Sequence, residues 1–177
     1  MIHRRLIAAI GLALMAGTAD AQDMPGMDHG SCAATNAPLP PALSGWTQRG
    51  SLGSAAQASA LKAAALPLGQ GILVALHPTR QVRYVTQPEK PGGSVAHGGM
   101  VALSIAAPGR YQVSLSSGTW IDMLKDGAAL ASVAHAPGPK CSSIRKTVVF
   151  ALRPGAYVLQ ISANADPTVT VMVTRVR

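Results

Sequence analysis

The sequence has 177 residues and a formal net charge of +8, with 15 Lys and Arg against 7 Asp and Glu. Aromatic residues make up only 3% of the chain, so a hydrophobic core has to be built from Val, Leu and Ile rather than from large rings. The basic residues are scattered and do not alternate with aromatic residues, which argues against nucleic acid as a partner. Scattered positive charge still leaves an acidic polymer of the cell envelope as one class of partner.

The N-terminal segment has the pattern of an export signal. Arg4 and Arg5 precede a short apolar run over residues 6–17, and Ala-Asp-Ala at 19–21 fits an A-x-A cleavage site. The run is too short to span a bilayer, and no second long apolar stretch follows it. We therefore predict a signal peptide over residues 1–21 and a periplasmic or secreted protein without a membrane span. The mature chain would have 177 − 21 = 156 residues, enough for one domain.

Two regions follow the signal, a flexible tail over residues 22–44 and one β-rich domain over residues 45–177. The tail contains Gly, Pro, Met and Ser, lacks a periodic apolar pattern and closes in Pro-Leu-Pro-Pro at residues 38–41. Within the domain, residues 54–66 are predicted to form a short helix. Ser54 can cap this helix, strong helix formers follow, and Pro67 ends it.

From Gly71 onward, short β-type runs alternate with turn signals, and apolar residues in several runs occupy every second position. This alternation is typical of antiparallel sheets with one buried face. Asp126-Gly127 predicts a hairpin that joins residues 120–124 to Leu130 and Val133. The expected fold is therefore all-β, an antiparallel two-sheet sandwich of the jelly-roll-like kind. The expected strands are residues 72–76, 81–86, 100–105, 110–116, 120–124, 129–134, 144–152, 156–162 and 168–174.

One pattern occurs twice, in residues 108–116 and 154–162. In each copy a Pro-Gly turn leads into a strand whose first inward residue is a tyrosine, Tyr111 or Tyr157. We expect each tyrosine to bury its ring and to reach a turn carbonyl with its hydroxyl. The alternative is that the two rings stack against a carbohydrate.

Residues 96–175 resemble the bacterial pre-peptidase C-terminal domain, a jelly-roll-like β-sandwich attached to secreted enzymes. The similarity lies in the segments PGRYQVSLSS, WIDMLKDG, TVVFALRPGAYVLQISA and the closing VTVMV. It implies a non-catalytic accessory or binding module. Through the segment AHAPGPKCSSIRKTVVF, the mature chain is also similar to short exported proteins that carry a homogentisate dioxygenase label. That second similarity implies a small non-haem iron dioxygenase.

The sequence itself offers little for catalysis. A non-haem iron site needs two histidines and a carboxylate, but the histidines of the mature chain, at positions 29, 77, 97 and 135, form no H-x-H or H-x-[DE] pair. Asp122 and Asp126 are four residues apart, and turn chemistry alone explains Asp126. Nucleophile-elbow, zinc-protease and phosphate-loop motifs are absent from the sequence. We therefore assign no catalytic residue and favour a protein that is not an enzyme, with the dioxygenase as an open alternative.

Cys32 and Cys141 are the only cysteines, and an even number in an exported protein predicts a disulfide between them. The alternative is that one or both remain thiols that bind a soft metal. Met24, Met27 and His29 precede Cys32 in an M-x-x-M-x-H-x-x-C spacing. This spacing resembles the Met/His-rich segments of periplasmic copper-handling proteins, because thioether and imidazole groups suit Cu(I).

A partial site at His135 and Cys141, held near the tail by proximity to Cys32, would form a second sphere around such a copper site. The alternative interpretation of the tail is a disordered linker in which Met and His occur by chance. Three functions therefore compete: an exported, non-catalytic sandwich that binds an envelope partner, a copper-binding protein that uses the tail, and a small dioxygenase. Composition, strand pattern and the missing catalytic motifs favour the first.

Overall fold

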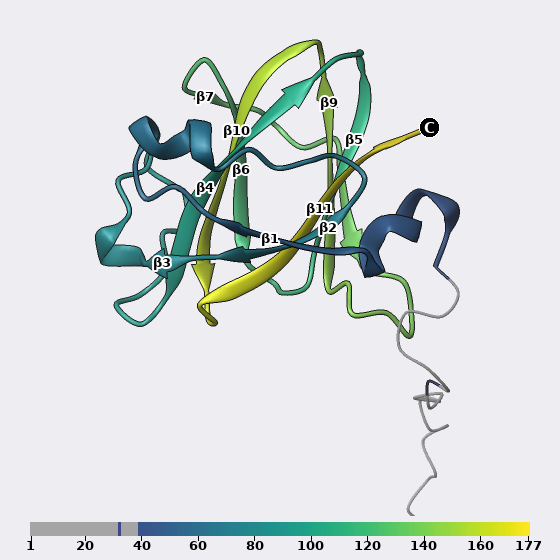
Figure 1. Cartoon of the computed structure of the whole chain (residues 1–177), viewed down its shortest axis with the longest axis horizontal. Coiled ribbons are helices and arrows are strands. Elements are labelled where there is room, and N and C mark those ends of the chain that lie inside the picture. The colour runs from purple at the N-terminus through teal and green to yellow at the C-terminus, as the bar shows by residue number, and fades with distance from the viewer. Residues whose placement is uncertain (1–31, 33–38) are drawn as a thin grey trace, which may run out of the picture. The chain divides into compact units, whose positions relative to one another are not determined.

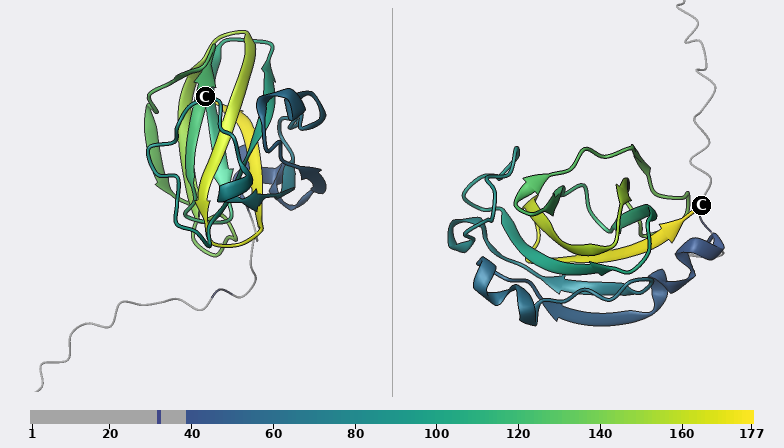
Figure 2. Two further views of the ribbon diagram at one scale, coloured as in Figure 1. Left: turned by 90° about the vertical axis from the view of Figure 1, so that its left-hand side faces the viewer. Right: turned by 90° about the horizontal axis from the view of Figure 1, so that it is seen from above.

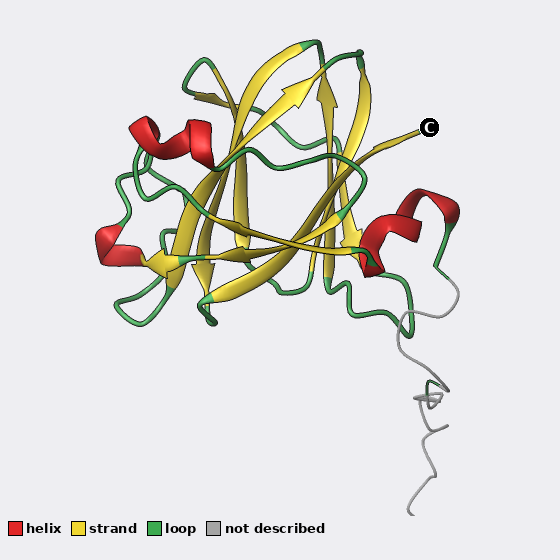
Figure 3. Cartoon of the chain, viewed as in Figure 1, coloured by secondary structure: helices red, strands yellow, loops and turns green. Residues whose placement is uncertain are grey.

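Alternating apolar residues build two stacked sheets in the computed structural model, which describes Cys32 and residues 39–177 (Figures 1 and 3). The six-stranded sheet has the order β1-β2-β11-β5-β9-β8 and the five-stranded sheet the order β3-β4-β10-β6-β7. Neighbouring strands pair antiparallel except β1 and β2, which are parallel. The all-β, two-sheet sandwich predicted from the sequence is therefore confirmed.

The strands of the six-stranded sheet are β1 (Arg49–Gly53), β2 (Gly71–Ala75), β11 (Thr168–Val176), β5 (Gly109–Leu115), β9 (Lys146–Leu152) and β8 (Ala134–Pro137). Those of the five-stranded sheet are β3 (His77–Pro78), β4 (His97–Ile105), β10 (Gly155–Asn164), β6 (Trp120–Lys125) and β7 (Ala128–Ala129). Three short 3-10 helices complete the described elements: η1 (Pro41–Thr47), η2 (Ala58–Ala63) and η3 (Thr79–Gln81).

The core lies between the two sheets and consists mainly of aliphatic side chains, as the low aromatic content requires. Val101, Leu103 and Ile105 point inward from β4, and Val171 and Val173 point inward from β11. Residues two apart share a face of a strand, so one buried face per strand accounts for the alternation in the sequence.

Both Pro-Gly-x-Tyr repeats form the corners that we expected. Tyr111 and Tyr157 are 4% and 5% exposed, so neither ring is available to stack against a ligand. The Tyr111 hydroxyl donates to the Ala107 carbonyl at 2.8 Å, and the Tyr157 hydroxyl donates to the Arg153 carbonyl at 2.9 Å. Each tyrosine therefore fixes the turn that leads into its own strand, β5 or β10.

The helix expected over residues 54–66 is reduced to the six-residue 3-10 helix η2. Both ends of this segment pair with the edge of β4: Ala55 forms a bridge with Met100, and Ala65 forms one with Ala102. These backbone groups are thus committed to the sheet and are not available for an α-helix. The segment also covers the edge of β4, which protects it from pairing with another chain.

The strand expected over residues 81–86 is not formed. This segment lies against β10, where the Gln160 side chain accepts from the Thr86 backbone nitrogen and donates to the Thr86 carbonyl, at 3.1 and 2.9 Å. The Tyr84 hydroxyl donates to the Ile161 carbonyl. The Gln160 side chain thus makes the hydrogen bonds that the backbone of a neighbouring strand would make. The pattern of residues 81–86 alone does not predict this.

The strand expected over residues 129–134 is divided between the sheets. The Asp126-Gly127 hairpin is confirmed, because Leu124 pairs with Ala129 and the Leu130 nitrogen donates to the Met123 carbonyl. The chain then leaves the five-stranded sheet, and Val133 already bonds to β9 of the other sheet.

The N-terminal part of the described chain lies at the edge of the six-stranded sheet, where β1 runs beside β2 (Figure 2). β1 has no apolar alternation and was not predicted, because its pairing with β2 is a long-range contact. The expected boundary between residues 44 and 45 falls inside η1, whose Leu43 and Trp46 pack with Ile144 and Met172. In the part of the chain that the structure describes, no helix is long and apolar enough to cross a membrane.

Candidate functional site

A cleft of about 650 Å³ opens beside strands β6 and β9. Its lining comes from both sheets: from β6 and β7 on one side, from β8 and β9 on the other, and from the connection between β7 and β8. This volume lies within the range of small-molecule sites in proteins.

The cleft exists because β6 is only partly covered along one edge. β10 pairs with β6 from Trp120 to Leu124, whereas β7 pairs only with Leu124 and Lys125. After Leu130 the chain crosses to the six-stranded sheet, so the beginning of β6 is left without a strand neighbour on that side. The same crossing that divided the expected strand thus creates the cleft.

Apolar side chains of the core form one part of the cleft wall. Val148 and Phe150 of β9, Ile121 of β6 and the half-buried Leu130 all line it. Trp120 also lines the cleft and is half-buried. Of the six aromatic residues in the sequence, only Trp120 and Tyr84 are half-buried, and the other four are buried. Trp120 is therefore the one aromatic ring in the cleft that remains partly open to a ligand.

Polar contacts hold the Trp120 ring in place. Its indole nitrogen donates to Asp122 Oδ1 at 3.0 Å. Lys90 Nζ lies 4.7 Å and Lys146 Nζ lies 5.5 Å from the centre of the ring, distances at which a cation is attracted to the π-system. Lys146 Nζ also donates to the Thr119 carbonyl at 2.9 Å, which ties β9 of one sheet to the start of β6 in the other.

Three titratable groups near the cleft, those of Asp122, Lys146 and Tyr84, have shifted pKa values. Burial raises the pKa of Asp122, the hydrogen bond from Trp120 opposes this rise, and the charge of Glu89 adds to it. Burial lowers the pKa of Lys146, and the charge of Lys90 lowers it further. Burial, with a smaller contribution from Asp122, raises the pKa of Tyr84 to about 12. The carboxylate and the ammonium group are thus both incompletely solvated.

These charges do not neutralise one another by direct contact. Among the described residues, the only ion pair is Lys125 with Asp126 at 3.8 Å, in the β6–β7 turn and outside the cleft. Asp122 Oδ2 is buried and has no hydrogen-bond partner. A buried polar atom left without a partner costs about 1–3 kcal/mol, so a donor that reached Asp122 Oδ2 would remove this cost.

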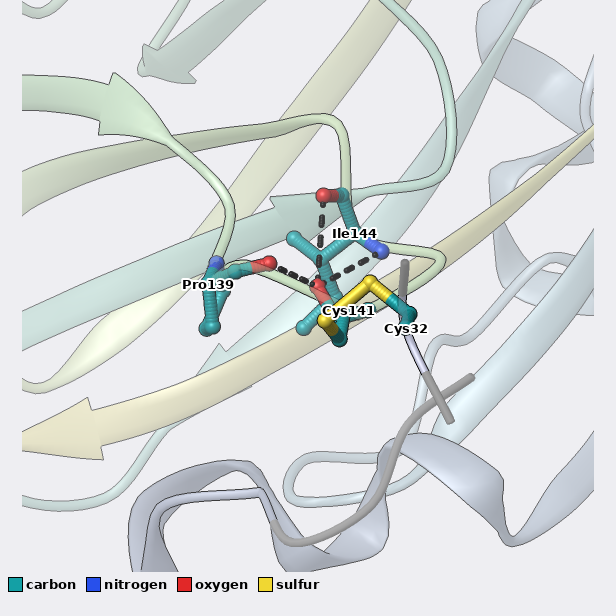
Figure 4. The surroundings of a disulfide bond; sticks show 5 residues. Cys32, Pro139, Cys141 and Ile144 are labelled. Carbon is teal, nitrogen blue, oxygen red and sulfur yellow. Dashed lines mark hydrogen bonds between the residues drawn. A yellow bond between two sulfur atoms is a disulfide. The ribbon is translucent and has the colours of Figure 1, made fainter. Parts of the chain in front are cut away.

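The predicted disulfide between Cys32 and Cys141 is confirmed (Figure 4). The two Cα atoms are 5.3 Å apart, within the usual range for a bridge. Cys141 lies in the loop between β8 and β9, where Ser142 Oγ donates to the Pro139 carbonyl at 2.7 Å and accepts from the Ile144 nitrogen at 3.3 Å. The alternative that one or both cysteines remain metal-binding thiols is wrong, since both sulfur atoms are in the disulfide.

The other metal-site residues are only partly within the structure. Met24, Met27 and His29 lie outside the described residues, so the copper site stays a prediction. His135 is exposed on β8 and lines the cleft. His77 Nε2 lies 2.9 Å from the Ser54 carbonyl oxygen. Across Cys32 and residues 39–177, no three His, Cys, Asp or Glu side chains are grouped so that they could hold a metal ion.

Two groups highlighted in the sequence therefore reach the cleft, Asp122 and His135, while Asp126 stays in its turn. Trp120, Lys90, Lys146 and Glu89 were not predicted as site residues. No protein-family model matches the chain, and no curated protein matches it either. The candidate site thus rests on its own geometry: a β-sandwich with a ligand-sized cleft, a fixed tryptophan and unpaired charges.

Proposed function

We propose that this chain is an exported, non-catalytic binding protein of the cell envelope and that the cleft beside Trp120 is its ligand site. The observation that carries this proposal is Trp120 itself, a large ring that lines the cleft, is half-buried and is fixed by the hydrogen bond to Asp122. Aromatic side chains with a polar handle are typical anchors of binding sites. An accessory or binding role also agrees with the resemblance to pre-peptidase C-terminal domains.

The cleft suits recognition better than catalysis. It contains a hydroxyl, an imidazole and carboxylates, in Ser132, His135, Asp122 and Glu89. In residues 39–177, no hydrogen bond is formed between any two of these side chains, so none is set up as a base beside a nucleophile. Binding needs no such relay, only complementary groups on a rigid frame.

Export to the periplasm or the medium is part of the same proposal. The disulfide supports it, because such bonds persist in oxidising compartments and are rare in the cytosol. The signal-like pattern over residues 1–21 gives the route, and residues of the mature chain would meet envelope components directly.

Crystallographic fragment screening tests the site without assuming a ligand. Fragments should collect in the cleft rather than in the groove of about 270 Å³ over β1 and β2, which contains the exposed Leu73. Trp120→Ala should abolish cleft binding, and the control Leu73→Ala should leave it intact. Fragments spread evenly over the surface, or cleft binding unchanged in Trp120→Ala, would contradict the proposal.

A second candidate function is copper binding by the tail, for which the disulfide is again the relevant observation. The bond consumes both cysteines and joins Cys32 to the loop that follows the strand of His135. The soft donors that remain are Met24, Met27, His29 and His135.

Competition with a Cu(I) chelator tests this second candidate. The mature protein should retain copper at chelator concentrations that strip the variant with Met24, Met27 and His29 changed to Ala. The matched control is His77→Ala, which should behave like the parent because His77 is engaged with the Ser54 carbonyl. Equal loss of copper from the parent and the triple variant would reject a copper site in the tail.

A further inference from the structure

The charges around the cleft are balanced, which bears on what can bind there. Lys90 and Lys146 carry two positive charges beside Trp120, and Glu89 and Asp122 carry two negative charges. A purely anionic ligand would meet the two carboxylates, and a purely cationic one would meet the two ammonium groups. The +8 charge of the whole chain is therefore not concentrated at the cleft. Because the positive and negative groups around the cleft are equal in number, the cleft favours a ligand without net charge.

The hydrogen-bonding groups of the cleft require both donors and acceptors from a ligand. The unpartnered Asp122 Oδ2 can only accept from a donor while ionised. Lys146 uses one N–H for the Thr119 carbonyl and has others to donate. A hydroxyl group both donates and accepts, so adjacent hydroxyls on one ligand can serve the carboxylate and the ammonium group together.

The edge of β6 adds one backbone pair to this set. The Met123 carbonyl accepts from the Leu130 nitrogen, so the backbone groups of Met123 point away from β10. Alternate residues of a strand point the same way, and Ile121 therefore presents its N–H and C=O on the same edge, where no described strand pairs with it. One residue is too short a template for a peptide to add as a strand, which relies on a series of main-chain bonds.

We propose that the cleft binds a neutral saccharide, with the ring of the sugar against Trp120 and its hydroxyls between Asp122 and Lys146. This assignment rests on the proposed function of the cleft as a ligand site. The C–H face of a pyranose would cover the half-buried ring of Trp120. Its hydroxyls would donate to the Asp122 carboxylate, whose buried Oδ2 has to turn toward the cleft, and would accept from Lys146, while Lys90, which is exposed, moves off the ring.

Tryptophan fluorescence gives a direct readout, because the chain has only two tryptophans and Trp46 is fully buried with η1. Trp46→Phe leaves Trp120 as the only tryptophan, whose emission is excited selectively at wavelengths that tyrosine does not absorb. This protein would be titrated with neutral oligosaccharides built from glucose, galactose, mannose and N-acetylglucosamine. Polygalacturonate, spermidine, free amino acids and an unstructured peptide would be titrated in parallel.

At least one neutral oligosaccharide should change the emission saturably, with an affinity that does not depend on salt. Asp122→Asn should weaken that affinity at least about tenfold, and Trp120→Ala, measured by calorimetry, should weaken it further. Asp122→Asn preserves the shape of the side chain, so it remains informative if Trp120→Ala does not fold. Leu73→Ala, on the opposite sheet's exposed surface, should bind as the parent does. The bound sugar should be recovered unchanged by mass spectrometry.

Other outcomes separate the two proposals. Saturable binding of polygalacturonate, spermidine, amino acids or the peptide at the cleft, with no neutral sugar bound, would overturn the saccharide assignment and leave a ligand site. Cleavage of the bound sugar would overturn the non-catalytic role and leave the ligand class. No change with any probe, together with an empty cleft in the fragment screen, would overturn both.

Discussion

Removing the disulfide should cost much of the stability of this protein. The bond joins residues 109 positions apart, so it closes a loop of about that length in the unfolded chain. In the chain-entropy model, closing a loop of about 100 residues reduces unfolded-state freedom by about 4.7 kcal/mol at 25 °C. The perturbation is the double variant Cys32→Ser with Cys141→Ser, which leaves no unpaired thiol.

The measured loss should be close to that figure, because other contacts hold the same loop in the folded state and keep it from gaining freedom when the bond is removed. Trp46 Nε1 donates to Ser143 Oγ at 2.8 Å, and Ile144 is buried against η1. Equilibrium unfolding in urea, with the m-value checked for each protein, should give a loss of about 3–5 kcal/mol.

A second double variant separates the effect of the disulfide on stability from the effect of the backbone conformation at Cys141. Cys141 has φ = 56°, in the left-handed region where a side chain is strained, so Cys32→Ser with Cys141→Gly should recover about 1 kcal/mol of the loss. A loss below about 1 kcal/mol in the double serine variant would refute the loop-closure reasoning.

Three further predictions concern the core, the tyrosine corners and the cleft. Phe150→Ala should cost about 3–5 kcal/mol in urea unfolding, because the ring is 2% exposed and packs in the core, and a loss below about 1 kcal/mol would contradict its central position. Tyr157→Phe should destabilise by about 1–3 kcal/mol and more than Tyr111→Phe, since the Tyr157 hydroxyl both donates to the Arg153 carbonyl and accepts from the Arg153 nitrogen; equal losses would speak against the second bond. The raised pKa of Asp122 means that folding favours the protonated form of this carboxyl group. The protonated group therefore contributes to the free energy of unfolding below its ordinary pKa of 3.8, and this contribution is lost as the pH rises through the raised pKa. The stability of Asp122→Asn relative to the parent should therefore increase as the pH is raised from acid to neutral. A difference in the free energy of urea unfolding that does not change with pH would contradict the raised pKa of Asp122.

The parts of the fold that were predicted correctly depend on local patterns. The alternation in residues 101–105 and 169–173 needs only one buried face per strand, and the Pro-Gly-x-Tyr corners close within four residues, from Tyr111 to Ala107 and from Tyr157 to Arg153. Asp126-Gly127 likewise specifies its hairpin through two adjacent residues, both with positive φ.

The predictions that were wrong concern segments whose secondary structure is determined by contacts with residues distant in the sequence. Residues 54–66 have helix-forming composition, but Ala55 and Ala65 pair with β4, and long-range pairing overrides the propensity. Residues 81–86 resemble a strand, but Gln160 binds their backbone with a side chain. β1 was missed because its partner β2 begins 18 residues after β1 ends.

The cleft could not be predicted from the sequence for the same reason. Glu89 comes from a loop, Trp120 and Asp122 from β6, and Lys146 from β9, so only the register of two sheets brings them together. Asp122 was noticed, but as half of a pair with Asp126, which lies in the β6–β7 turn beside Lys125 and outside the cleft. His135 was noticed as a metal ligand, and its place in the cleft follows from its pairing with Val148.

Nuclear magnetic resonance of the two indole N–H groups measures ligand binding at the cleft itself. The Trp120 N–H donates to Asp122 in the cleft, whereas the Trp46 N–H donates to Ser143 beside η1. On titration with neutral oligosaccharides, the Trp120 signal should shift saturably and the Trp46 signal should stay where it is. A Trp120 signal that no ligand moves, or equal shifts of both signals, would contradict a binding site at this cleft.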